Sequence, residues 1–121
     1  MKEAIVLFAH GSRDPEWARP FERISSEVAR RLPHATVCVA YLESMRPSFD
    51  EAIAALAAAG AQSIRVVPLF LAPGGHVKED LPRLVANAAA ARPALDIALE
   101  QPIGERPEVI AAIAQAITAG Q

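Results

Sequence analysis

The chain has 121 residues, 52% of them hydrophobic, and a formal net charge of −2 at pH 7. This length suits a single domain, 1–121, that is large enough to bury its own core. The small net charge, with acidic and basic residues scattered along the chain, excludes an extended basic surface, so neither nucleic acid nor a membrane is expected as a partner.

Two strands and two helices are predicted in the first half of the chain. Residues 3–10 form a continuous apolar run, as expected of a strand covered on both faces, and 35–43 form a second one. Between them, apolar residues recur at helical spacing at Trp17, Phe21, Ile24 and Val28. Pro20 lies too deep for a helix that starts at Asp14, so this helix begins near Pro20 or is kinked there. Residues 47–60 are the second helix, with proline and acidic residues at its start and glycine at its end.

The second half of the chain repeats this order. Residues 63–72, rich in β-branched side chains, predict the third strand, and 94–100 predict the fourth. The third helix is expected to begin near Asp80, with Pro82 in its first turn. Its inward face would carry Leu81, Leu84, Val85 and Ala88. The last helix opens at Pro107, and its predicted buried side consists of Ile110, Ile113 and Ile117.

Strands that alternate with helices over short connections are typical of a parallel sheet. No internal repeat, linker or low-complexity segment divides the sequence. The sequence therefore predicts an α/β fold, a single (βα)4 unit of three layers with a four-stranded parallel sheet and helices on both faces.

The N-terminus and the cysteine content indicate the compartment. The apolar residues after Glu3 are too few for a transmembrane helix, and no small-residue cleavage site follows them. The single cysteine, Cys38, lies in mid-strand, excludes an internal disulfide and favours a reducing compartment. We expect a cytoplasmic protein with no chemistry at Cys38.

Polar side chains follow three of the predicted strands. His10 ends the first strand, Glu43 ends the second, and His76 comes after the third. Because ligands bind beyond the carboxyl ends of strands in open α/β sheets, we expect these side chains at one edge. Two imidazoles and a carboxylate suit cobalt, nickel, iron or zinc better than calcium or magnesium. For each residue alone a structural role stays open, such as a bond to a neighbouring carbonyl or a cap on a strand end.

The Pro-Gly-Gly segment before His76 predicts a binding loop. Gly74 and Gly75 allow positive φ and uncover backbone N–H groups, and a helix N-terminus that follows favours an anion. Arg13, Arg46 and Lys78 fall at the same edge and suit a carboxylate-bearing ligand. The alternative is that the two glycines only relieve a tight turn. No phosphate-binding loop of the G-x-G-x-x-G or Walker type is present.

These segments resemble one family. "HGSRDPEW" at 10–17, "YLE" at 41–43, "PLFLAPGGHVKEDLP" at 68–82 and "PIGERPEV" at 102–109 are similar to the short-form sirohydrochlorin cobaltochelatases. These are class II chelatases of the cobalamin and sirohaem branch of tetrapyrrole biosynthesis. The third-strand motif is the most specific part, and the similarity spans nearly the whole chain.

The resemblance implies ATP-independent insertion of a divalent metal into sirohydrochlorin by a homodimer. The metal would be Co²⁺, with Fe²⁺ or Ni²⁺ as alternatives, and no cofactor beyond this metal substrate is implied. His10 would be a metal ligand and proton acceptor, His76 the second metal ligand, and Glu43 an acidic partner in metal delivery or proton removal. Contacts to the macrocycle are expected at Ser12, Arg13, Arg46, Leu71, Ala72, Pro73, Gly74 and Gly75. Relatives often carry an acid at the position before Pro47, where this chain has Arg46.

Three other functions compete with the chelatase. A non-catalytic carrier of metal or tetrapyrrole would use the same histidines, and only Glu43 discriminates, since a base matters for turnover more than for binding. A phosphoryl-transfer enzyme with a histidine nucleophile usually has arginine directly before that histidine, whereas Ala9 stands there. A flavodoxin-like cofactor module is disfavoured by the short sheet and by the lack of a phosphate loop after the first strand.

Overall fold

Strands form within the four apolar-rich segments that the sequence predicts as strands, and helices fill the segments between them. The computed structural model describes residues 2–72 and 74–120. Its strands are β1 (Glu3–Ala9), β2 (Thr36–Tyr41), β3 (Ser63–Pro68) and β4 (Asp96–Leu99). Its helices are α1 (Arg19–Arg31), α2 (Phe49–Ala58), α3 (Gly75–Ala91) and α4 (Pro107–Thr118), with short 3₁₀ helices η1 (Pro15–Ala18) and η2 (Ile103–Glu105).

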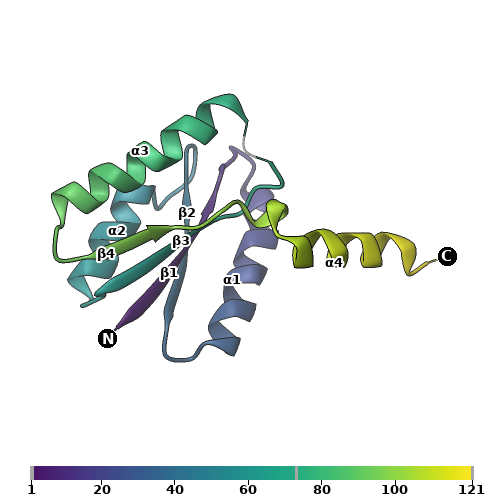
Figure 1. Ribbon diagram of the computed structural model, residues 1–121, viewed down its shortest axis with the longest axis horizontal. Helices are drawn as coiled ribbons and strands as arrows, with labels where there is room; N and C mark the ends of the chain where they lie inside the picture. Colours follow the sequence, from purple (N-terminus) through teal and green to yellow (C-terminus); the bar gives the residue numbers. More distant parts are fainter. Residues whose placement is uncertain (1, 73, 121) are drawn as a thin grey trace.

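The four strands form one parallel sheet in the order β2-β1-β3-β4 (Figure 1). In the centre, Ala4 of β1 is opposite Thr36 of β2 on one side and Ile64 of β3 on the other. Six of the seven residues of β1 are buried, which explains why this strand is apolar without alternation. The predicted α/β fold with a four-stranded parallel sheet is confirmed.

Helices α2 and α3 cover one face of the sheet, and α1 packs against the other. Phe8 of β1 meets Phe49 of α2 edge to face, with ring centroids 5.7 Å apart, and Leu81 and Val85 of α3 join the same core. On the opposite face, Val28 of α1 packs against a smaller buried cluster on β1 and β3. The core therefore lies mainly between the sheet and the α2–α3 layer.

The structure confirms one predicted helix start and corrects another. α1 begins at Arg19, so Pro20 lies in the first turn, where its missing N–H is not needed, and the conflict over this residue disappears. α3 begins at Gly75 rather than near Asp80. Pro82 is therefore inside α3 and not in its first turn, and the predicted start of this helix is wrong.

The last helix differs most from expectation. α4 projects away from the sheet (Figure 1), and none of its residues is buried. Ile110, Ile113 and Ile117 are 55%, 40% and 71% exposed, so the prediction that they form a buried side within this chain is wrong. Within residues 2–72 and 74–120, no helix is long and apolar enough to span a membrane.

Candidate metal-handling site

Backbone pairing beyond β1 and β2 brings His10 and Glu43 together. The Leu42 N–H donates to the Ala9 carbonyl at 3.0 Å, and the Glu43 N–H donates to the His10 carbonyl at 3.1 Å. The two segments that follow β1 and β2 thus stay in register past the ends of these strands. As a result the Nε2 atom of His10 lies 2.8 Å from Oε1 of Glu43, and the predicted proximity of these two side chains is present in the structure.

Gly11 makes this close approach possible. Its φ is +96°, a backbone conformation that side chains with a Cβ rarely adopt. A Cβ at this position would lie 1.8 Å from the carbonyl oxygen of Glu43, far inside van der Waals contact. The sequence analysis predicted no role for Gly11. Its position directly after the strand-end histidine was the one feature of the sequence that indicated such a role.

The His10–Glu43 pair defines which imidazole nitrogen is free. A carboxylate accepts hydrogen bonds, so Nε2 of His10 donates to Glu43 and Nδ1 keeps its lone pair. The side chains are 47% and 61% exposed, respectively, which leaves them open to a ligand. Such a histidine can coordinate a divalent metal or accept a proton, and its carboxylate partner stabilises the resulting positive charge.

His76 occupies a different setting from the other two residues. It is exposed in the first turn of α3, and no hydrogen bond joins it to His10 or Glu43. Among the described residues, no group of three His, Cys, Asp or Glu side chains is close enough to hold a metal ion. The structure therefore brings two of the three expected metal-handling residues together. A metal ion bound by His76 requires further ligand atoms, such as those of a substrate.

Three of the predicted substrate-binding residues line one shallow pocket. Ser12, Arg13 and Arg46 surround a volume of about 330 Å³ next to η1. Arg46 forms an ion pair with Glu51, which lowers the pKa of that carboxyl to about 2. Arg13 makes no ion pair within the described part of the chain, so it is the more available cation for an anionic ligand.

The segment after β3 presents an open surface. Leu71 is 71% exposed, and Ala72, Gly74 and Gly75 are exposed as well. Neither Gly74 nor Gly75 has a positive φ, so this turn does not use the conformational freedom that glycine allows. Nothing lies within 4 Å of a Cβ built at either residue, so a ligand can approach the N-terminus of α3 closely. Pro73, the remaining predicted contact, lies outside the described residues.

Gly104 in η2 fixes the position of this segment. Its N–H donates to the Phe70 carbonyl at 2.9 Å. A Cβ on Gly104 would lie 2.3 Å from the carbonyl oxygen and 2.4 Å from the Cα of Leu71. The contact was not anticipated from the sequence, although the family-like segment 102–109 contains this glycine.

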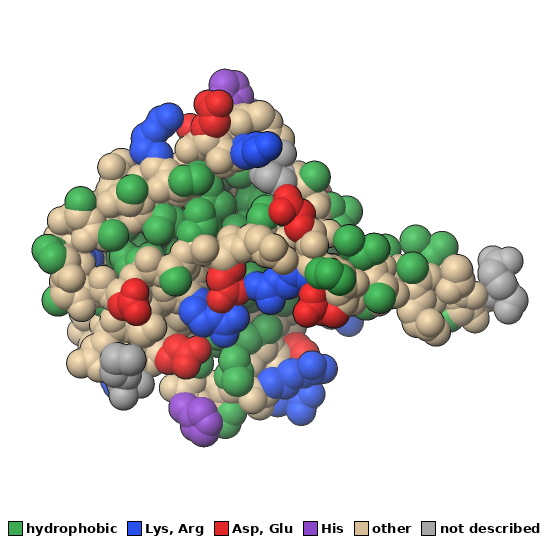
Figure 2. Space-filling model, viewed as in Figure 1, with side chains coloured by type: hydrophobic (Ala, Val, Ile, Leu, Met, Phe, Trp, Pro, Cys, Tyr) green, Lys and Arg blue, Asp and Glu red, His purple; other side chains and the backbone are tan. Residues whose placement is uncertain are grey.

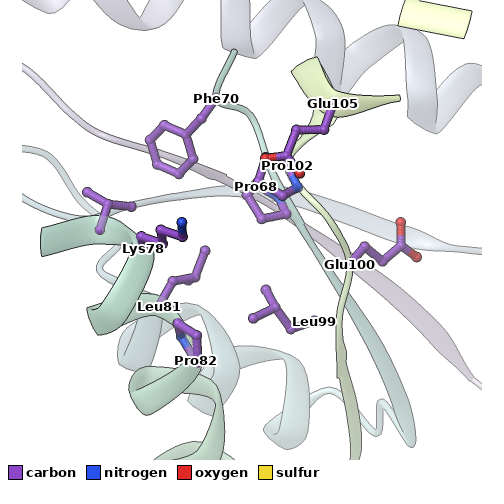
Figure 3. Close-up of a pocket in the computed structure, with 10 residues that line it drawn as sticks. Pro68, Phe70, Lys78, Leu81, Pro82, Leu99, Glu100, Pro102 and Glu105 are labelled. Carbon is purple, nitrogen blue, oxygen red and sulfur yellow. The ribbon is translucent and has the colours of Figure 1, made fainter. Parts of the chain in front are cut away.

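A smaller pocket lies behind the same segment, between α3 and the ends of β3 and β4. Figure 3 shows Phe70, Lys78, Leu81 and Leu99 around it, and its volume is about 200 Å³. Pockets that enclose drug-sized ligands have volumes of roughly 300–1,000 Å³. Lys78, predicted at the ligand edge, therefore lines a cavity too small for a large organic ligand.

Other residues near the ligand edge have structural roles. Oδ1 of Asp14 accepts a hydrogen bond from the Glu16 N–H at 3.0 Å and caps η1. Trp17 packs on Phe21, with ring centroids 4.5 Å apart. Burial raises the pKa of the Cys38 thiol, which suits a residue without chemistry.

Comparison with known proteins identifies the family. A family model described as CbiX matches residues 4–119. The chain belongs to the CbiX family. The resemblance to sirohydrochlorin chelatases that the sequence motifs indicated is thereby confirmed, since curated relatives carry that description.

Curated relatives of this CbiX family member include both cobalt and iron enzymes. A sirohydrochlorin cobaltochelatase of Methanopyrus kandleri is 39% identical over 82 residues, 68% of this chain and 57% of the relative. One of Methanosarcina acetivorans is 32% identical over 85 residues, 70% of this chain and 65% of the relative. A sirohydrochlorin ferrochelatase of Bacillus subtilis is 29% identical over 113 residues, 93% of this chain and 43% of the relative. The chain thus spans less than two thirds of the length of each of these relatives.

Solved structures match over nearly the whole chain. A CbiX protein of Marinobacter aquaeolei VT8 is 32% identical with a TM-score of 0.85, covering 98% of this chain and 96% of that one. The sirohydrochlorin chelatase SirB of Bacillus subtilis subspecies spizizenii, in complex with cobalt, is 32% identical with a TM-score of 0.77. That match covers 98% of this chain but only 51% of SirB, so one copy of the fold corresponds to half of the longer protein.

Proposed function

We propose that this protein inserts a divalent metal ion into sirohydrochlorin without ATP or a resident cofactor, and that Co²⁺ is its metal, with Fe²⁺ or Ni²⁺ as alternatives. The observation that carries the proposal is the exposed His10–Glu43 pair, with one imidazole nitrogen free at the ligand edge of the sheet. Membership of the CbiX family and the chelatases among the relatives support it.

The pair suits the chemistry of insertion. The macrocycle exchanges two pyrrole N–H protons for one metal ion, so insertion needs proton acceptors and a temporary metal ligand. Nδ1 of His10 can serve in either role near neutral pH, and Glu43 stabilises the imidazolium or the incoming cation. His76 would contribute a second imidazole ligand to the metal ion during its transfer to the macrocycle.

The surroundings of the pair suit a macrocycle that carries many carboxylates. Arg13 and Ser12 lie beside the pair, and Arg46 would exchange its bond with Glu51 for a substrate carboxylate. The exposed segment of Leu71, Ala72, Gly74 and Gly75 offers an apolar edge, and the first turn of α3 offers backbone N–H groups that lack intrahelical partners.

A broad, flat ring needs a second wall, and we propose that a second copy of the chain supplies it in a homodimer. The correspondence of this chain to half of SirB supports this assembly. The proposed location is the cytoplasm, in cobalamin or sirohaem biosynthesis.

The proposal is tested by mixing the purified protein with sirohydrochlorin and Co²⁺ without oxygen and following the macrocycle absorbance. His10→Ala and Glu43→Gln should each lower the rate by ~10²–10⁴-fold, the usual contribution of a general base. His34→Ala, a histidine exposed in the turn before β2, is the matched control and should keep the full rate. Parallel reactions with Fe²⁺ and Ni²⁺ establish the metal preference.

Tight binding of metal or macrocycle without turnover above the enzyme-free rate would reject the chelatase and leave a carrier. Equal rates for Glu43→Gln and the unmodified protein would reject the role of Glu43 while leaving insertion itself intact.

A further inference from the structure

One buried tyrosine at the ligand edge has a hydroxyl without a partner. Tyr41 is the last residue of β2 and is only 5% exposed. Its ring lies beside that of Trp17, with centroids 6.4 Å apart, and in the same buried cluster as Ala18 of η1. Within residues 2–72 and 74–120, no hydrogen bond involves its hydroxyl, and no fully buried side-chain oxygen or nitrogen lacks a partner. The hydroxyl is therefore accessible from outside and is not enclosed in the core.

The opening that reaches Tyr41 is the shallow pocket of about 330 Å³ next to η1. The polar residues that share it come from the segments after β1 and β2 and are Ser12, Arg13, Ser44 and Arg46. Tyr41 precedes Glu43 by two positions, so their Cα atoms are at most ~7 Å apart. The same limit applies to Ser12 and His10. The walls of the pocket are thus continuous with the two segments that carry the proposed metal-handling pair.

The pocket offers three donors to an anion. Oγ of Ser12 accepts a hydrogen bond from the Asp14 N–H at 3.1 Å, which leaves the Ser12 O–H free to donate. The Arg13 guanidinium makes no ion pair in the described part of the chain. Burial and the nearby charge of Glu22 raise the pKa of Tyr41, so its hydroxyl stays protonated and donates. One charged donor and two hydroxyl donors suit a carboxylate.

The other pocket at the ligand edge offers no comparable set of donors. It lies between α3 and β4, where Figure 2 shows hydrophobic side chains over most of the hollow. Among the described residues that line it, Lys78 is the one side chain that can donate, and the other charged residues are the acids Glu100 and Glu105. The pocket of Tyr41 also contains one acid, Glu22, but its hydroxyl donors have no counterpart between α3 and β4.

We propose that Tyr41 is a specificity-determining residue that binds one carboxylate arm of the macrocycle. Its hydroxyl donates to the carboxylate, and Arg13 and Ser12 bind the same group. The buried ring fixes the hydroxyl before the substrate arrives, so little side-chain freedom is lost on binding. A macrocycle with an uncharged arm at this position would leave the donors unpaired and would bind more weakly. The inference rests on the proposed function, because it takes sirohydrochlorin as the ligand.

The test combines a fluorescence titration of the protein with metal-free sirohydrochlorin and steady-state rates of Co²⁺ insertion. Tyr41→Phe keeps the buried ring and removes only the hydroxyl. It should raise the dissociation constant of the macrocycle by ~10–100-fold, the usual effect of losing a hydrogen bond to a charged group. The loss should appear in KM and not in kcat, because an arm on the rim of the ring is bound equally before and during insertion.

Three further variants separate a shared binding site from damage to the fold. Arg13→Ala should also weaken binding, and the double variant should lose less than the product of the two single losses, because both residues bind one carboxylate. Glu22→Gln removes the charge that opposes the arm and should tighten binding by ~2–5-fold, which damage to the fold would not do. Arg23→Ala, on the same helix but outside the pocket, is the matched control and should bind as the unmodified protein does.

The outcomes distinguish this inference from the chelatase activity itself. Equal dissociation constants for Tyr41→Phe and the unmodified protein, with insertion intact, would overturn the role of Tyr41 and leave the proposed function standing. Fully independent losses from Tyr41→Phe and Arg13→Ala would overturn the shared site. Weaker binding by Tyr41→Phe in a protein that shows no turnover would support the binding site and reject insertion. An unmodified protein that binds no macrocycle would overturn both proposals.

Discussion

Gly11→Ala tests whether the close approach at the end of β1 positions the His10–Glu43 pair. The structure supplies a matched control in Gly60, whose φ of +94° nearly equals the +96° of Gly11. A Cβ at Gly60 would meet only the end of the Lys2 side chain, at 3.7 Å, whereas one at Gly11 would meet the Glu43 carbonyl at 1.8 Å. The two substitutions therefore share the backbone strain and differ in the clash.

The expected magnitudes follow from these contacts. A side chain forced into a left-handed backbone conformation costs ~1–2 kcal/mol, and this is the whole effect expected for Gly60→Ala. At Gly11 the Glu43 carbonyl must also retreat, which removes the hydrogen bond from the Glu43 N–H to the His10 carbonyl and adds ~0.5–1.5 kcal/mol or more. For a domain of this size, 1 kcal/mol corresponds to roughly 4 °C in Tm.

Urea unfolding and thermal melting of both variants, at one protein concentration, measure the difference. Metal insertion into sirohydrochlorin is then followed for the folded variants. Gly11→Ala should lose activity as Glu43→Gln does, because the carboxylate no longer reaches Nε2 of His10, whereas Gly60→Ala should keep it. Equal unfolding free energies for the two variants, together with full activity of Gly11→Ala, would refute the reasoning.

Two further predictions concern stability. In the capping box of α2, the side chains of Ser48 and Glu51 accept hydrogen bonds from each other's backbone N–H. Ser48→Ala removes this capping box and should lower the free energy of unfolding by ~1 kcal/mol in a urea titration. An unchanged unfolding midpoint would contradict this role. Hydrogen bonds from Arg65 and Arg106 lower the pKa of Glu100 below its ordinary value of 4.5. The stability that Glu100 contributes is therefore present above pH 4.5 and lost as the pH falls through its lower folded-state pKa. Melting temperatures from pH 6 to pH 3 should fall more steeply for the unmodified protein than for Glu100→Gln, and parallel curves would reject this ion-pair effect.

The local sequence pattern was sufficient to predict the sheet and the His10–Glu43 pair. β1 is apolar without alternation because six of its seven residues are buried, and this is visible in the sequence. Parallel strands deliver their carboxyl ends to one edge, so His10 and Glu43 could be placed together before the structure was known. The close approach of the two segments that carry His10 and Glu43, in contrast, depends on Gly11. The role of Gly11 is visible only when the backbone of Glu43 is seen beside it.

The remaining differences arise where local preference and tertiary structure disagree. Gly74, Gly75 and Pro82 all disfavour a helix, so the sequence indicated a later start for α3 than the structure has. The spacing of apolar residues in α4 was identified correctly, but periodicity shows only that a helix has an apolar side. It does not show which surface, or which chain, covers that side.

The contact at Gly104 limits how the ligand edge can open. Because no side chain fits between η2 and the backbone of Leu71, a displacement of Leu71 would push on η2. η2 ends at Glu105 and α4 begins at Pro107, so such a displacement would be passed on to the start of the last helix.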